Sequence, residues 1–110
     1  MTRRQEQELT NSICKEQFNA AIEELEAQGF AAFGNSERLR NCNAEVYETD
    51  SYYILKSYAT FVACIEKSTN NCFDMLRIVY GYTNTSARQI AKFIEDYGCR
   101  YAQHFTAKDA

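Results

Sequence analysis

The sequence predicts an α+β fold in which an N-terminal and a C-terminal helix pack on one face of a small antiparallel sheet of three or four strands, in the order α-β-β-β-α. Three observations support this prediction. Apolar residues recur at helical period over 12–28 and again in the segment that ends at Gly98. β-branched and aromatic residues dominate the chain between these two segments, which suits the pleated surface of a sheet. No proline interrupts any of them.

The length and composition of the chain indicate one domain over residues 1–110. A chain of 110 residues can bury a real core without disulfides or metals. Its composition, 45% hydrophobic and 25% charged, is ordinary for a globular protein. We expect the polar ends, 1–11 and 106–110, to be flexible, with the alternative left open that 2–11 extend the first helix.

The first helix is expected over residues 12–28. Ser12 is a suitable N-cap, because its hydroxyl can accept a hydrogen bond from a free backbone N–H of the first turn. Gly29 is a suitable stop, since glycine tolerates a positive φ. The apolar stripe of this helix consists of Cys14, Phe18, Ala21, Ile22 and Leu25.

Four strands are expected next, at 45–48, 52–57, 58–67 and 72–82. Residues 68–71 form a hairpin loop of common length between the last two. If Lys67 faces Cys72, one face of this hairpin is mostly apolar and suits the helix-covered core. The other face also carries apolar residues, so we expect it to need a partial cover, a second subunit or a target protein.

The last helix follows the polar run Thr83-Asn84-Thr85-Ser86 and ends at Gly98. Thr83 or Thr85 could cap this helix. Alternatively, the hydroxyls and free N–H groups of the turn could hold an anion, with Arg88 one turn further along. Capping is the simpler interpretation, because such clusters are common before helices, and the sequence leaves both open.

The charge of the chain is concentrated in its first segment. The net charge is -3, and residues 1–30 contain three basic and six acidic residues, whereas residues 31–110 contain nine of each. An acidic chain without a basic stripe is a poor candidate for direct binding of nucleic acid. No apolar run is long enough to cross a membrane, and no signal peptide precedes the domain, so we expect a cytoplasmic protein.

The sequence contains no recognisable set of catalytic residues. His104 is the only histidine, and no pattern places a nucleophile and an orienting acid beside it. Cys64 lies in the middle of a predicted strand, whereas a reactive thiol favours a helix N-terminus. The five cysteines include no CxxC and no Cys–His spacing typical of zinc. We therefore expect no enzymatic activity, no metal and no cofactor.

Binding of another protein is the remaining interpretation. Eight tyrosines without a tryptophan could form an amphipathic contact surface. An acidic first helix could compete for a basic nucleic-acid groove on a target. The candidate binding residues are Glu23, Glu24, Glu26, Tyr53, Tyr58, Val62, Met75, Arg77, Tyr82 and Arg88.

A resemblance to a known group of proteins covers residues 52–98. The matching positions are Leu55, Ser57, Tyr58, Thr60, Val62 and Ala63, then Tyr82, Thr85, Ser86, Ile90 and Phe93. In these residues the chain resembles small uncharacterised proteins of phages, plasmids and integrated elements in Firmicutes. The resemblance implies an accessory factor in a bacterial host cell, a class that includes small inhibitors of bacterial immunity such as anti-CRISPR proteins. It brings no catalytic residues.

We therefore expect a non-enzymatic protein-binding factor of a phage or mobile element that inhibits a defence nuclease, such as a Cas nuclease, by protein contact. Two alternatives stay open. The order α-β-β-β-α also matches the double-stranded-RNA-binding domain, although the last helix here lacks a cluster of lysines. The apolar second face of the sheet would also suit a small homodimeric structural protein.

Overall fold

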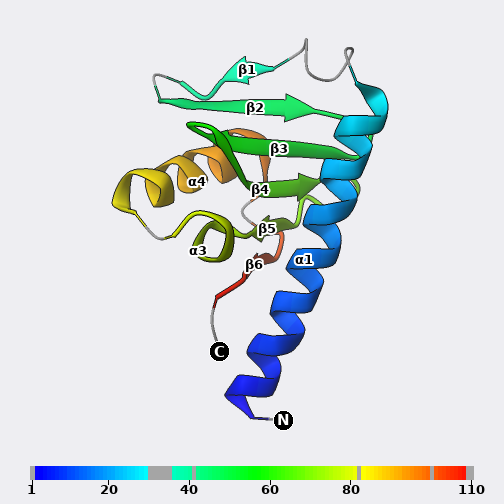
Figure 1. Cartoon of the computed structure of the whole chain (residues 1–110), viewed down its shortest axis with the longest axis vertical. Helices are drawn as coiled ribbons and strands as arrows, with labels where there is room; N and C mark the ends of the chain where they lie inside the picture. Colours follow the sequence, from blue (N-terminus) through cyan, green and yellow to red (C-terminus); the bar gives the residue numbers. More distant parts are fainter. Residues whose placement is uncertain (1, 30–35, 41, 82, 100, 109–110) are drawn as a thin grey trace.

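The computed structural model describes residues 2–29, 36–40, 42–81, 83–99 and 101–108. In this part of the chain, the helices are α1 (Arg3–Gln28), α3 (Leu76–Val79) and α4 (Asn84–Tyr97). Six strands form one sheet in chain order: β1 (Glu37–Arg38), β2 (Ala44–Glu48), β3 (Tyr52–Ser57), β4 (Thr60–Glu66), β5 (Cys72–Asp74) and β6 (His104–Thr106). Neighbouring strands are antiparallel except β5 and β6, which are parallel (Figure 1). The α+β class is confirmed, but the sheet is larger than predicted.

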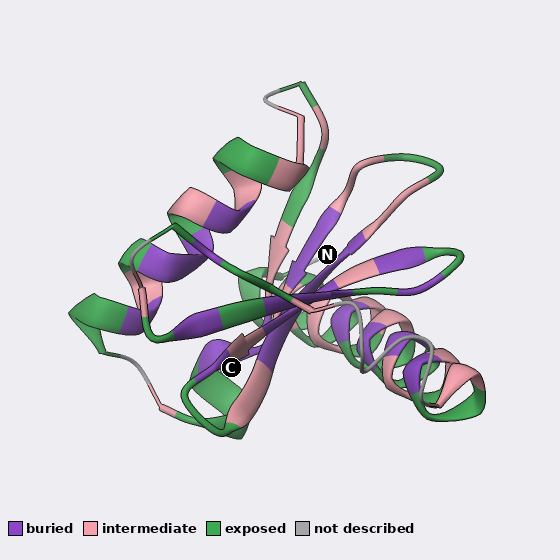
Figure 2. Cartoon of the chain, turned by 90° about the horizontal axis from the view of Figure 1, so that it is seen from above, coloured by how far each residue is buried: buried purple, intermediate pink, exposed green. Residues whose placement is uncertain are grey.

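The helices α1 and α4 cover opposite faces of this sheet (Figures 1 and 2). The prediction that both helices lie on one face is therefore wrong. The physical reason lies in β4, where four consecutive residues, 62–65, are buried. Successive side chains of a strand point to opposite faces, so a strand buried without interruption needs a cover on each side. The second apolar face, for which a partner was expected, is covered by α4 of the same chain.

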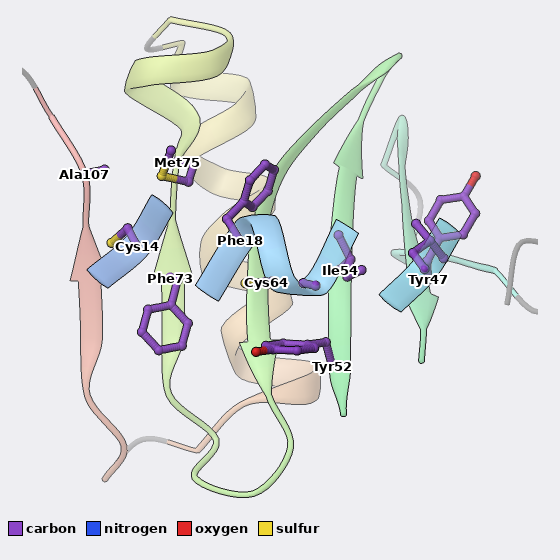
Figure 3. Close-up of a cluster of buried hydrophobic side chains, with 11 residues drawn as sticks. Cys14, Phe18, Tyr47, Tyr52, Ile54, Cys64, Phe73, Met75 and Ala107 are labelled. Atoms are coloured by element: carbon purple, nitrogen blue, oxygen red, sulfur yellow. The ribbon is translucent and has the colours of Figure 1, made fainter. Parts of the chain in front are cut away.

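One hydrophobic cluster lies between α1 and the sheet (Figure 3). Phe18 and Cys14 project from α1 onto Cys64 and Phe73 of the central strands, and Phe73 stacks on Phe105 with ring centroids 5.3 Å apart. Its buried members are Cys14, Phe18, Ala21, Leu25, Tyr47, Tyr52, Ile54, Cys64, Phe73, Met75 and Ala107. The predicted apolar stripe of the first helix thus faces the sheet, as its period indicated.

A second cluster lies between α4 and the other face of the sheet. Phe93 is fully buried there, and Ile90 accompanies it one turn earlier on α4. The remaining buried members are Leu39, Ala44, Val46, Leu55, Val62, Ala63, Ile65, Cys72 and Leu76. This cluster holds α4 along the sheet, and it thereby determines which residues of α4 reach the surface.

The two ends of the described chain are tied to each other. Thr2 and Gln5 form a capping box at the start of α1, so the helix begins nine residues before the predicted Ser12. The side chain of Gln7 donates to the carbonyl of Thr106 at 3.0 Å, and Asn11 exchanges hydrogen bonds with the backbone of Lys108. The segments 2–11 and 106–108, for which flexibility was expected, are thus the start of α1 and a strand end that hydrogen bonds join to each other.

The last predicted strand is much shorter than expected. The hairpin pairs Ile65 with Cys72, two residues away from the predicted register, and this even shift keeps 63–65 and 72–74 on their expected faces. A β-bulge opposite Leu55 and Lys56 reverses Phe61 and Val62, so that Val62 lies under α4 instead. The strand β5 then stops at Asp74, because its carboxylate accepts the N–H of Leu76 at 2.9 Å and starts the helical turn of α3. The prediction of a strand over 72–82 is therefore wrong beyond Asp74.

The limits of α4 agree with the sequence prediction. The hydroxyl of Thr83 accepts the N–H of Ser86 at 3.1 Å, so Thr83 is the N-cap. A Cβ added at Gly98 would lie 2.8 Å from the carbonyl oxygen of Ile94, which explains the glycine at the helix end. Among the helices that the structure describes, none has the length and apolar character that a membrane crossing requires.

Candidate functional site

Tyr58 occupies an unusual position in the turn between β3 and β4. Ser57 pairs with Thr60, so Tyr58 and Ala59 form a two-residue hairpin turn. Tyr58 has φ +54°, in the left-handed region that such turns require and that glycine, asparagine and aspartate favour. The residue is 51% exposed, and its backbone N–H donates to the carbonyl of Asn43 at 2.9 Å. An aromatic side chain is therefore held at the surface in a conformation that costs free energy.

A hollow of about 260 Å³ lies beside this turn. We call it the Tyr58 hollow, and its lining residues are Cys42, Asn43, Tyr58, Thr85, Arg88, Gln89 and Lys92. The four residues from α4 stand at i, i+3, i+4 and i+7, which is one stripe along the flank of the helix. The polar stripe is next to the apolar stripe of α4, which packs Ile90 and Phe93 into the core. Because the apolar stripe fixes α4 on the sheet, the polar stripe faces the Tyr58 turn.

A chain of buried polar groups leads to Gln89, one of the residues that line the Tyr58 hollow. Ser57 and Ser86 are fully buried, and their hydroxyl oxygens are 3.2 Å apart. The Ser57 hydroxyl donates to Oε1 of Gln89 at 2.5 Å, and since it has only one proton, Ser86 is the donor to Ser57. These bonds join the end of β3 to α4 and orient the Gln89 amide.

The wall opposite α4 is formed by the connection between β1 and β2. Nζ of Lys92 lies 3.3 Å from Sγ of Cys42 in this connection. Arg40 donates to Asp96 at 2.7 Å and to Glu95 at 2.8 Å, and the hydrogen bond from Arg40 lowers the pKa of Asp96 below its ordinary value. The connection is thus fastened to the C-terminal half of α4, which keeps the wall in place.

A second, wider hollow adjoins the first on the other side of the Tyr58 turn. It measures about 710 Å³ and shares Cys42, Asn43 and Tyr58 with the Tyr58 hollow. Arg38 and Glu45 also line it, so charges of both signs are present there. The Tyr58 ring therefore stands at the boundary of two depressions, with both of them open to a binding partner.

Of the predicted binding residues that the structure describes, Tyr58 and Arg88 both line the Tyr58 hollow. Glu24 lies at the other end of β3, where its carboxylate accepts the N–H of Ser51 at 2.8 Å. The six residues of β3 separate the two ends by about 20 Å. Glu23 and Glu26 are exposed on α1, on the opposite face of the sheet from α4. The acidic helix and the tyrosine thus belong to different surfaces.

Val62 and Met75 are not surface residues, and their prediction as contact residues is wrong. Val62 is fully buried under α4 and Met75 lies in the cluster under α1, because both faces of the sheet are covered. The expectation of a homodimer depended on the same open face. Tyr53 is partly buried, with its ring centroid 5.0 Å from that of Tyr97. Arg77 is exposed on α3, and Tyr82 lies outside the described residues.

Sequence reasoning missed Asn43, Gln89 and Lys92. Gln89 and Lys92 lie outside the apolar stripe of the last helix, and their spacing from Arg88 could have indicated a common neighbour. Asn43 could not have been found, since it reaches the hollow only through the pairing of β2 with β3. The six-stranded sheet with a helix on each face also differs from the predicted arrangement that motivated the comparison with the double-stranded-RNA-binding domain.

The chemistry available in the Tyr58 hollow is that of hydrogen-bond donation and positive charge. Within the described ranges, no group of three or more histidine, cysteine, aspartate or glutamate side chains could hold a metal ion. The buried thiols lie elsewhere, and burial raises the pKa of Cys14 to about 11.

None of the protein families, curated proteins or solved structures compared with the chain matches it.

Proposed function

We propose that this chain is a protein-binding accessory factor that contacts its target through the Tyr58 turn and the Tyr58 hollow. The observation that carries this proposal is the half-exposed Tyr58 at φ +54°. Asparagine or glycine would form this hairpin with less strain. Strained residues concentrate at functional sites, where the surrounding structure maintains them at a cost in stability.

The residue types around the turn favour a protein as the partner. Tyrosine and arginine dominate the energetic centres of protein interfaces, because both combine a large contact area with hydrogen bonding. Arg88 lies in the same hollow as the Tyr58 ring, and Arg38 lines the adjoining one. A protruding side chain of a partner could enter either hollow while packing on the ring.

The resemblance to proteins of phages and mobile elements supports a host or defence-system protein as the target. On this proposal the chain inhibits a defence nuclease, such as a Cas nuclease, by occupying a surface that the nuclease needs. Its role is binding and not catalysis. The exposed glutamates of α1 could add attraction to a basic surface, which would speed association more than it would strengthen the complex.

The proposal is tested by comparative capture from the bacterial host, followed by binding measurements with the purified partner. The bait is the full chain, the test variant is Tyr58→Gly, and the control is the double variant Glu23→Lys/Glu26→Lys. Glu24 is left unchanged, because its carboxylate bonds to the backbone of Ser51. We expect a partner that the wild-type chain and the control retain and that Tyr58→Gly loses.

The purified partner should then bind Tyr58→Gly at least about tenfold more weakly, as expected for loss of an aromatic anchor. Equal affinity of Tyr58→Gly and wild type for the purified partner would refute the proposed surface. Loss of binding in the glutamate variant alone would instead assign the contact to α1. If the partner is a nuclease, its inhibition should follow the same order of variants.

A further inference from the structure

Gln89 is a buried side chain with an unused hydrogen-bonding capacity. It is only 2% exposed, and its Oε1 is engaged by Ser57. Its Nε2 makes no hydrogen bond to any residue that the structure describes. No fully buried side-chain nitrogen or oxygen of the described residues lacks a partner, so this Nε2 keeps some accessible surface, and Gln89 lines the Tyr58 hollow. A nearly buried amide therefore has unused donor capacity at the edge of this hollow.

Two cationic side chains beside this amide also lack an acidic partner. Neither Arg88 nor Lys92 forms an ion pair with a carboxylate of the described residues. The contact of Lys92 is the sulfur of Cys42, a weak acceptor that a carboxylate oxygen would readily displace. No acidic residue is among those that line the Tyr58 hollow. A chain with net charge -3 thus concentrates positive charge and free donors at one place.

We propose that the Tyr58 hollow binds the side-chain carboxylate of an acidic residue in the protein partner. This inference deepens the proposed function and rests on it for the nature of the partner. The Gln89 amide and the Arg88 guanidinium donate to the carboxylate oxygens, and Lys92 supplies a further charge. The ring of Tyr58 packs on the neighbouring part of the partner's chain.

The geometry favours a carboxylate over a phosphate. Phosphate sites at helices use the free backbone N–H groups of the first turn, along the helix axis. In α4 the hydroxyl of the N-cap Thr83 already accepts the N–H of Ser86, which is one of the N–H groups that such a site would use. The Tyr58 hollow lies along the flank of α4 instead, where side chains supply the donors. A planar carboxylate matches a planar guanidinium beside a planar amide.

The test is a titration of the isotope-labelled full chain with short capped peptides, followed by NMR. The probes are hexaglutamate, hexaglutamine and inorganic phosphate, at low ionic strength. We expect hexaglutamate to shift the side-chain NH₂ signals of Gln89 in a saturable manner, and hexaglutamine to leave them unchanged. The variant Arg88→Gln/Lys92→Gln should bind hexaglutamate roughly tenfold more weakly or worse, because charge-assisted hydrogen bonds are lost.

The matched control is Arg3→Gln/Lys15→Gln, which removes the same charge from exposed positions on α1. It should bind hexaglutamate as the wild type does. Equal weakening of both variants would show attraction by net charge alone and would overturn the inference. So would an unshifted Gln89 signal, or saturation by phosphate at lower concentration than by hexaglutamate.

The titration is independent of the partner, so the two proposals can fail separately. If hexaglutamate shifts the Gln89 signals but Tyr58→Gly binds the partner as tightly as the wild type, the carboxylate site is supported and the proposed contact surface is refuted. If Tyr58→Gly loses the partner but hexaglutamate does not shift the Gln89 signals, the contact surface is supported and the carboxylate site is refuted.

Discussion

The strain at Tyr58 can be measured by comparing two substitutions that remove the same ring. Tyr58→Gly and Tyr58→Ala both lose the side-chain contacts, so their difference isolates the backbone at φ +54°. A left-handed conformation costs an L-residue about 1–2 kcal/mol, which alanine retains and glycine avoids. Glycine loses more entropy on folding, at about 0.5–1 kcal/mol. Tyr58→Gly should therefore be more stable than Tyr58→Ala by about 0.5–1 kcal/mol.

The sign of this difference is the critical result, because alanine is the more stable residue at ordinary positions. Urea denaturation followed by circular dichroism measures it, with the comparison made on transition midpoints, since extrapolated free energies carry larger errors. The matched control is Ala59→Gly in the same turn, where φ is not positive, and it should lower stability. A Tyr58→Ala variant as stable as Tyr58→Gly would refute the assignment of strain to this turn.

Three further predictions concern the core and the thiols. Phe93→Ala should lower the free energy of unfolding by about 3–5 kcal/mol in urea melts, because this ring is fully buried between α4 and the sheet. The control is Ile78→Ala, at an exposed position. Similar losses of stability in both variants would contradict the packing. Burial raises the pKa of Asp74, so its charged form destabilises the fold above that pKa. Asp74→Asn keeps an acceptor for the N–H of Leu76 and should be modestly more stable than the wild type near pH 7. The difference in stability between the two proteins should shrink as the pH falls toward 3.8. A difference that stays constant over this pH range in urea melts would contradict this reasoning. Mass spectrometry after iodoacetamide treatment at pH 8 should find two modified cysteines in the folded chain and five in denaturant, whereas fast modification of a third in the folded chain would contradict the burial. The reactive thiols are Cys42 and Cys99, and the protected ones are Cys14, Cys64 and Cys72.

The sequence by itself predicted the elements whose signals are local. The apolar stripe of α1, the cap at Thr83 and the stop at Gly98 follow from neighbouring residues, because helical period and capping involve only one or two turns of chain. The hairpin between β4 and β5 was predicted with 63–65 and 72–74 on the correct faces, whereas a β-bulge reverses Phe61 and Val62. Its register shifted by two residues, since alternation specifies the face of a strand and not its exact partner.

Short and non-local elements could not be predicted from the sequence. The strands β1 and β6 contain two and three residues, which is too few for a periodic signal. They are defined only by their pairing, β1 with the neighbouring β2 and β6 with the more distant β5. The choice of face for α4 was likewise decided by packing. The strand β4 has apolar side chains on both faces, and the alternation of the sequence does not say which helix covers which face.

The residues of the candidate site were likewise predictable from the sequence only in part. Tyr58 and Arg88 were named as candidates from their residue types, and their role in binding is a proposal. The Tyr58 hollow itself required the tertiary structure, because it joins a turn, a connection between two strands and the flank of a helix that are distant in sequence. Local sequence determines what a side chain can do chemically, whereas the packing of α4 across the sheet decided that Gln89 and Arg88 meet Tyr58.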